Sequence, residues 1–243
     1  MNCAVMQASR VYYADVLPAA KALIANSNVD KIYLLIEDDA YPGYLPSKIE
    51  TINVAALREH YFPNGCPNLR NKYVYLTLMR CALWDILPLD VDRVLTLDAD
   101  AFVINPMGNK PWTLDMGDAY VAGVMEPKLT IQKHHNYISA GVMIMDLNLI
   151  RLTNTGRQML YALNNRWYLW FEQDCINEVC AHRLKTLGNE WNSSQFTGIA
   201  PDDKILIRHF AYERTWRESA VFNYYKNLSW IDACNHTVDF NKK

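Results

Sequence analysis

Short apolar runs alternate with amphipathic stretches along the chain, and this pattern predicts strands separated by helices. The chain begins with an apolar run at 3–6, an amphipathic stretch at 12–25 and a second apolar run at 31–36. Strand, helix and strand in this order indicate a right-handed βαβ unit in a mainly parallel sheet. Further apolar runs predict strands at 49–54, 93–98, 101–104, 119–124, 141–146 and 205–209.

The clearest helical pattern spans residues 72–87, where apolar side chains recur at spacings of three and four, and Pro88 would end this helix. Helices are also predicted at 149–164 and 171–181. Residues 61–72, with two prolines and a glycine, predict a loop. The last thirty residues are rich in aromatic side chains and do not resolve into elements. The apolar stripe of the clearest helix consists of Leu76, Met79, Leu83 and Leu87.

The chain has 243 residues, of which 51% are hydrophobic, so we expect one large α/β domain rather than two. Lys and Arg total 24 against 26 for Asp and Glu, a balance that excludes an electrostatic nucleic-acid binder. No apolar run reaches the roughly 18 residues of a membrane span. The first residues do not resemble a signal peptide and the six cysteines form no C-x-x-C motif, so we expect reduced thiols and a cytoplasmic location.

Asp98 and Asp100 follow directly after the predicted strand at 93–98. In an extended chain residues two apart point the same way, and ligands of open α/β sheets bind at the carboxyl ends of the strands. Two carboxylates so close repel each other unless a proton or cation intervenes, and a divalent cation is the simple solution. Such an ion could also neutralise a diphosphate leaving group. The alternative is a turn with solvated aspartates, which the apolar strand before it disfavours.

A strand followed by D-x-D also opens the haloacid-dehalogenase-type phosphatases, in which the first aspartate attacks a phosphoryl group. That class places the motif near its N-terminus and usually has Thr or Val two residues after the second aspartate. Here the motif lies in the middle of the chain and Phe102 occupies that position. The phosphatase interpretation is therefore disfavoured.

Four segments, in order and spanning most of the chain, resemble retaining glycosyltransferase family 8, the group of glycogenin and bacterial lipopolysaccharide galactosyl- and glucosyltransferases. Residues 93–100 resemble its strand plus D-x-D, and 137–143 its Y-F-N-A-G-V segment. Residues 171–177 resemble D-Q-D-x-L-N, and 209–216 resemble H-[FY]-x-G-x-x-K-P-W. The resemblance implies a single GT-A-type α/β domain over 1–243, with a Rossmann-like, mainly parallel central sheet flanked by helices. The implied halves are 1–105 for the nucleotide, ending in D-x-D, and 106–243 for sugar and acceptor.

The resemblance also implies a set of site residues. Asp98, Asp100 and His209 would bind Mn²⁺, with Mg²⁺ as an alternative ion, and this donor set suits such a metal. Gln173 and Asp174 would lie beneath the transferred sugar as catalytic residues, although such a pair can also simply begin a helix. The implied donor-binding residues are Tyr12, Tyr13, Arg80, Asp98, Ala99, Asp100, Ser139, Ala140, Gly141 and Arg214, the last in place of a lysine on the diphosphate.

The chain departs from the family pattern at several positions. The segment at 7–13 lacks an acidic residue, which leaves uridine recognition open, and Ser139 stands where the family has Asn. Glu172 stands where the D-Q-D segment of the family has its first aspartate. Tyr212 replaces a glycine, and one residue is missing before Trp216.

The reaction implied is a retaining, metal-dependent transfer of a hexosyl group from a nucleoside diphosphate sugar, UDP-glucose or UDP-galactose, to an acceptor hydroxyl. The acceptor would be a carbohydrate, a lipid-linked sugar or a protein. Attack could occur on the leaving-group face, or a covalent intermediate could form on Asp174 or Glu172. The alternative outside enzyme chemistry is an inactive module that only binds a sugar nucleotide.

Overall fold

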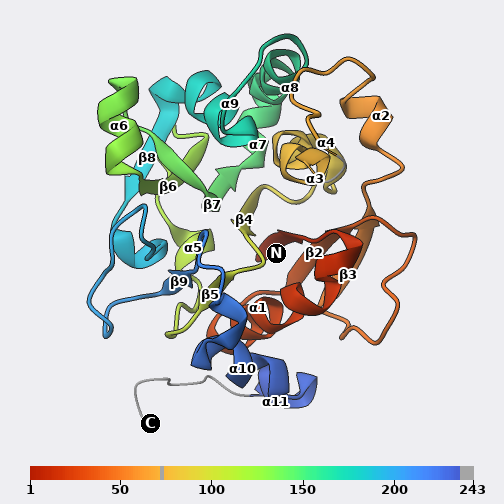
Figure 1. Ribbon diagram of the computed structural model, residues 1–243, viewed down its shortest axis with the longest axis vertical. Helices are drawn as coiled ribbons and strands as arrows, with labels where there is room; N and C mark the ends of the chain where they lie inside the picture. Colours follow the sequence, from red (N-terminus) through yellow and green to blue (C-terminus); the bar gives the residue numbers. More distant parts are fainter. Residues whose placement is uncertain (72–73, 236–243) are drawn as a thin grey trace.

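The computed structural model describes residues 1–71 and 74–235, and its centre is a sheet of seven strands (Figure 1). The strand order is β3-β2-β1-β4-β7-β6-β8. The first four of these strands run parallel, whereas β7 runs antiparallel to both of its neighbours. The mainly parallel α/β sheet predicted from the sequence is therefore confirmed. The strands are β1 Cys3–Gln7, β2 Lys31–Ile36, β3 Ile49–Asn53, β4 Arg93–Leu97, β6 Val121–Met125, β7 Ile138–Asp146 and β8 Leu184–Leu187.

A second, two-stranded sheet joins distant parts of the chain. Strand β5 (Ala101–Val103) pairs antiparallel with β9 (Ile207–His209), and Ala101 lies opposite His209. The backbone N–H of Phe210 continues the ladder by donating to the carbonyl of Asp100 at 3.0 Å. This pairing carries the end of β9 to the D-x-D turn that follows β4.

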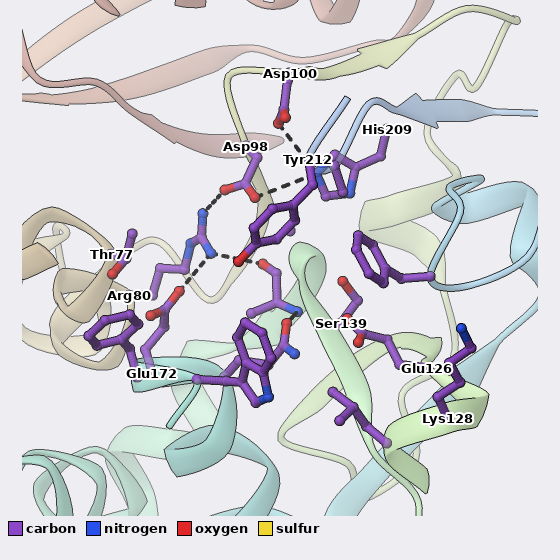
Figure 2. Close-up of a pocket in the computed structure, with 18 of the residues that line it drawn as sticks. Thr77, Arg80, Asp98, Asp100, Glu126, Lys128, Ser139, Glu172, His209 and Tyr212 are labelled. Atoms are coloured by element: carbon purple, nitrogen blue, oxygen red, sulfur yellow. Dashed lines mark hydrogen bonds and ion pairs between the residues drawn. The ribbon is translucent and has the colours of Figure 1, made fainter. Parts of the chain in front are cut away.

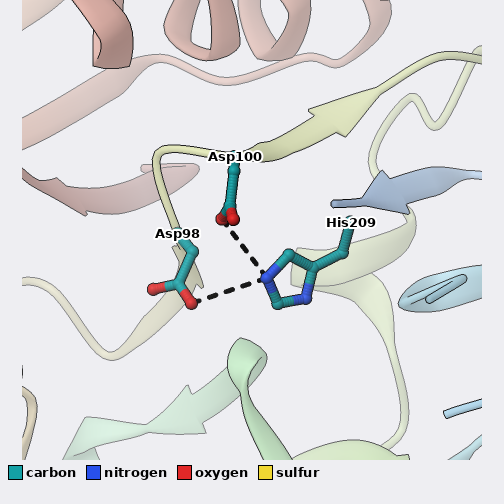
Figure 3. A group of neighbouring side chains, drawn as sticks. All are labelled: Asp98, Asp100 and His209. Carbon is teal, nitrogen blue, oxygen red and sulfur yellow. Dashed lines mark ion pairs between the residues drawn. The ribbon is translucent and has the colours of Figure 1, made fainter. Parts of the chain in front are cut away.

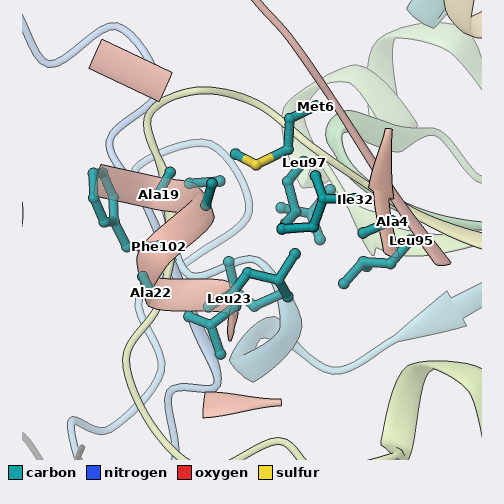
Figure 4. Packing of buried hydrophobic residues seen from close by; sticks show 14 of the residues in the cluster. Ala4, Met6, Ala19, Ala22, Leu23, Ile32, Leu95, Leu97 and Phe102 are labelled. Atoms are coloured by element: carbon teal, nitrogen blue, oxygen red, sulfur yellow. The ribbon is translucent and has the colours of Figure 1, made fainter. Parts of the chain in front are cut away.

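Each face of the central sheet is covered by its own set of helices. Because successive side chains of a strand point to opposite faces, neighbouring residues of one strand pack against different helices. Ala4 and Met6 of β1 pack against α1 (Tyr13–Asn26) on one face (Figure 4). Val5 packs on the other face, among residues of a second group of helices. Those helices are α3 Val74–Leu78, α4 Leu83–Ile86, α7 Leu147–Leu152, α8 Thr155–Asn165 and α9 Phe171–Val179. The other helices are α2 Arg58–Tyr61, α5 Lys110–Thr113, α6 Pro127–Lys133, α10 Ala220–Asn227 and α11 Trp230–Asn235.

Two helices predicted as continuous are interrupted. The helix expected at 72–87 consists of α3, a 3₁₀ turn at Met79–Ala82 and α4, and its first two residues lie outside the described part of the chain. The helix expected at 149–164 breaks between α7 and α8, where Asn154 has a φ of 57°. Just after this break, a Cβ on Gly156 would lie 2.2 Å from the Trp84 ring, so the close contact between helices requires glycine.

Strand and helix positions otherwise follow the predictions closely. The strand expected at 141–146 is the second part of the longer β7, and the one at 205–209 is the shorter β9. Among the helices and strands of the described residues, six had no counterpart in the sequence analysis: α2, α5, α6, β8, α10 and α11. Among the described residues no helix is both long enough and apolar enough to cross a membrane.

Candidate active site

Three predicted metal ligands lie together at the carboxyl end of β4 (Figure 3). Asp98 and Asp100 occupy the turn between β4 and β5, and His209 ends β9 opposite β5. The Nε2 atom of His209 is 3.6 Å from Oδ2 of Asp98 and 3.3 Å from Oδ1 of Asp100. One ligand atom from each residue lies within 4.8 Å of the other two. Strand pairing therefore assembles this cluster from two distant segments.

The cluster fits a divalent cation both in its donor atoms and in the space around them. Two carboxylates and one imidazole are ligands that suit Mn²⁺ and similar ions. Gly141 of β7 packs directly beneath, where an added Cβ would lie 2.2 Å from Cε1 of His209 and 2.9 Å from Oδ2 of Asp98. Only a residue without a side chain leaves these ligands in place.

A buried amide orients the histidine. Nδ1 of His209 is 2.9 Å from Oδ1 of Asn192, and both side chains are buried. Because the amide oxygen can only accept, Nδ1 carries a hydrogen, and Nε2 is the ring nitrogen that faces the two carboxylates. Burial opposes a positive charge on His209, but the hydrogen bond and charge of Asp100 raise its pKa overall. Asn192 lies outside the four segments that carry the family resemblance, so the sequence analysis gave it no role at the site.

Arg80 connects the cluster of Asp98, Asp100 and His209 to helix α9. Its guanidinium group is buried in the 3₁₀ turn at Met79–Ala82, forms an ion pair with Asp98, and lies 3.0 Å from Oε1 of Glu172 on α9 (Figure 2). It also donates to the carbonyl of Ala140 at 3.1 Å. Burial raises the pKa of Glu172, while the positive charge of Arg80 opposes that shift. The arginine predicted to face the donor is thus held by two carboxylates.

A cavity of about 520 Å³ opens on one side of the D-x-D turn. Gln173 lines it, and its Oε1 accepts from the backbone N–H of Ala140 at 2.8 Å. The predicted residues that line this cavity are Arg80, Asp98, Asp100, Ser139, Ala140, Gly141, Gln173 and His209.

Asp174 is placed differently from the expectation that it lies beneath the sugar. Its carboxylate accepts from the Tyr137 hydroxyl and from the Trp170 backbone N–H, both at 2.8 Å, and lies 3.2 Å from Nζ of Lys133. It does not line the cavity and instead stabilises the first turn of α9. Glu172, two residues earlier, is the acid of this segment that faces the cavity.

A further carboxyl group in the cavity was missed. Glu126 follows β6 directly, lines the cavity and is 9% exposed. Burial raises its pKa, and hydrogen bonds from Ser139 and Gln173 partly offset the shift. The available signal was an acidic residue at the end of an apolar strand, the same pattern that identified Asp98.

A second cavity of about 370 Å³ lies on the other side of the D-x-D turn, and Asp98, Asp100 and Thr77 border both cavities. Tyr12 lines the second cavity. Tyr13 does not, because its buried hydroxyl donates to Asp38 at 2.9 Å. The other residues that line this cavity are Gln7, Ala8, Ser9, Leu76, Ala99, Trp216 and Arg217.

The basic residue of the second cavity is Arg217 rather than the predicted Arg214. The Arg217 guanidinium lies 5.4 Å from the Tyr12 ring centroid and 4.5 Å from that of Trp216. It donates to Asp15 at 2.8 Å. Arg214 is exposed and lines neither cavity. Arg217 directly follows Trp216, and both side chains line the second cavity.

The chain matches a sequence family, and its fold matches that of solved structures. The family model of Glycosyl transferase family 8 matches residues 6–209. No curated protein matches the sequence.

Three solved structures illustrate the match in fold, and all three are GT-A glycosyltransferases. The bifunctional glycosyltransferase WbbM has a TM-score of 0.71 and 15% identity over 97% of this chain, which spans only 51% of WbbM. The galactosyltransferase LgtC, solved with donor and acceptor sugar analogues, has a TM-score of 0.67 and 16% identity over 96% of this chain and 99% of LgtC. GlyE of Streptococcus pneumoniae has a TM-score of 0.68 and 18% identity over 96% of this chain and 62% of GlyE. With the family model extending over most of the residues, the chain belongs to glycosyl transferase family 8.

Proposed function

We propose that the protein is a retaining, metal-dependent glycosyltransferase that moves a hexosyl group from UDP-glucose or UDP-galactose to an acceptor hydroxyl. One observation supports this most directly: the cluster of Asp98, Asp100 and His209 lies between two cavities that share its carboxylates. A nucleoside diphosphate sugar has the same division, with a nucleoside on one side of the diphosphate and a sugar on the other.

The cluster would hold the cation, with Mn²⁺ as the proposed ion and Mg²⁺ as the alternative. When bound, the ion supplies positive charge that stabilises the departing diphosphate. Gly141 leaves the space this site needs, and Asn192 fixes the histidine ring.

On the nucleoside side, Tyr12 offers an aromatic face to the base and Arg217 offers a cation. Ser9 lies at the same cavity, and its buried hydroxyl has no hydrogen-bond partner within the described chain. A nucleoside would satisfy this group, because a buried hydroxyl without a partner is costly. We assign Arg217, in place of Arg214, to the nucleotide and its phosphates.

On the sugar side, two carboxyl groups of the described residues line the cavity besides the two aspartates, those of Glu126 and Glu172. Glu126 accepts hydrogen bonds from Ser139 and Gln173, and burial raises its pKa, which favours the neutral form that is a poor nucleophile. Glu172 is bound to Arg80 and Asp174 lies outside the cavity, so a covalent intermediate would require the Glu172–Arg80 ion pair to break. We therefore favour attack on the leaving-group face. The acceptor oxygen bonds to the anomeric carbon, the bond from that carbon to the diphosphate oxygen breaks, and the acceptor proton passes to the diphosphate.

The test is incubation with UDP-, GDP- and dTDP-sugars, with and without Mn²⁺, and with a set of carbohydrate acceptors. Mn²⁺-dependent release of UDP and a product with the donor's anomeric configuration, read by proton NMR, are expected. Binding of UDP without turnover on any acceptor would instead indicate a binding module. Release of phosphate from phosphomonoesters would revive the phosphatase interpretation.

A further inference from the structure

Tyr212 has a backbone conformation that its side chain does not favour. Its φ is 60°, in the left-handed region where a residue with a Cβ is strained and glycine is not. Strained residues persist when the surrounding structure or the function holds them. Core packing does not explain Tyr212, because the residue is 75% exposed.

Phe171 provides an instructive comparison, since it has a φ of 48° and lines the same cavity. Its ring packs 4.0 Å from the Arg70 guanidinium, which gives the strained residue a structural partner. Among the described residues, the one ring that contacts the Tyr212 ring is that of Phe196, edge-on with centroids 5.5 Å apart, and Phe196 is itself 39% exposed. The chain therefore tolerates strain at Tyr212 without a matching gain in packing.

The Tyr212 side chain extends across the 520 Å³ cavity, from the His209 side toward Arg80 (Figure 2). Partial enclosure of its phenol by the cavity, followed by the negative charges of Glu126, Asp98 and Glu172, raises the pKa of Tyr212. The phenol thus stays protonated, in a cavity that is also lined by Arg80, Glu172 and Gln173.

We propose that Tyr212 determines specificity for an acceptor hydroxyl over water by covering the sugar during transfer. This inference rests on the function proposed above. Water and an acceptor hydroxyl are similar nucleophiles, so an open cavity would allow hydrolysis: the water oxygen bonds to the anomeric carbon, the carbon–diphosphate bond breaks, and a proton passes to the diphosphate. Covering the sugar prevents this side reaction, as closure does in other enzymes. An acceptor large enough to displace the ring reaches the sugar, whereas a single water does not.

Stability measurements test the strain itself. Y212G should melt at or above the temperature of the wild-type protein, because glycine adopts the left-handed conformation freely. Y212A keeps a Cβ at the same φ and should melt below Y212G. If the melting temperature of Y212A is equal to or above that of Y212G, the backbone at this position is not strained and the role proposed for Tyr212 fails.

Hydrolysis without acceptor tests the function of the ring. Mn²⁺-dependent release of UDP from UDP-glucose and UDP-galactose should rise about fivefold in Y212A and Y212G, the change expected from loss of one aromatic contact. Y212F keeps the ring and should behave as wild type. Y44A is the matched control, since Tyr44 is also 75% exposed but lines neither cavity of the site.

The outcomes separate this inference from the proposed function. If wild-type protein neither binds UDP with Mn²⁺ in a calorimetric titration nor releases it from either donor, the proposed function fails and the inference fails with it. If wild-type protein releases UDP but Y212A and Y212G release no more than it does, the proposed function stands and the role of Tyr212 is wrong. A rise in Y212F equal to that in Y212A would also overturn it, because the ring would then have no effect.

Discussion

Replacing Gly141 by alanine tests the ion site through one added carbon atom. That Cβ would lie 2.2 Å from Cε1 of His209 and 2.9 Å from Oδ2 of Asp98. Carbon atoms in contact are normally about 3.5 Å apart or more, so the imidazole has to move by about 1.3 Å. The ring is buried and its Nδ1 is bound to Asn192, so it cannot move without losing that hydrogen bond.

Two effects of G141A are expected. The affinity for Mn²⁺ should fall about 10- to 100-fold, the usual effect of disturbing the groups that support metal ligands. The free energy of unfolding should fall by about 1–3 kcal/mol, the cost of forcing an extra methyl group into a packed region. Isothermal titration calorimetry with Mn²⁺ measures the first effect, and urea denaturation measures the second.

Gly123 on the neighbouring strand β6 provides the control. A Cβ there would lie 3.0 Å from Cδ1 of Ile138, the end of a flexible side chain away from the ligands. G123A should therefore lose some stability and bind Mn²⁺ as the wild-type protein does. If G141A binds Mn²⁺ with wild-type affinity, His209 and the two aspartates do not hold the ion together, and the reasoning from their geometry is refuted.

Three further changes test other parts of the site. N192A removes the acceptor for Nδ1 of His209 and should weaken Mn²⁺ binding about 10-fold in the same calorimetric titration, and unchanged affinity would argue against this support. R217A should weaken UDP binding about 10-fold or more, whereas R214A should leave it unchanged. The reverse result would favour Arg214, the residue that the family resemblance implies for the diphosphate. Burial raises the pKa of Glu126, so between its ordinary and raised values the folded protein binds more protons than the unfolded chain and stability falls as pH rises. Urea denaturation between about pH 4 and about pH 8 measures this fall in the free energy of unfolding. The fall should be smaller in E126Q, and an unchanged pH profile would contradict the raised pKa of Glu126.

The sequence predicted those parts of the site that depend on local pattern. Asp98 and Asp100 follow an apolar strand, and the period of two in a strand is enough to place both carboxylates on one side. His209 was found through its motif, and β9 does bring it to the aspartates. The order of apolar and amphipathic stretches along the chain likewise predicted the mainly parallel sheet.

The parts that could not be predicted depend on contacts between distant segments. Helix α9 presents Glu172 and Gln173 to the cavity but turns Asp174 away, and one residue along a helix rotates a side chain by about 100°. Arg217 lines the second cavity and Arg214 does not, and an irregular segment has no period from which this could be predicted. The 3₁₀ turn in the helix expected at 72–87 carries Arg80, whose two carboxylate partners lie outside that helix.

The pairing of β5 with β9 also has a consequence for how the protein reaches its native state. The aspartates and the histidine are separated by most of the second half of the chain, so closing this loop is entropically costly and its contacts are non-local. The proposed ion site therefore forms only once the late segment has joined the early one. An ion that binds the folded chain and not the unfolded chain stabilises the pairing of β5 with β9. The melting temperature should therefore rise with the concentration of the ion.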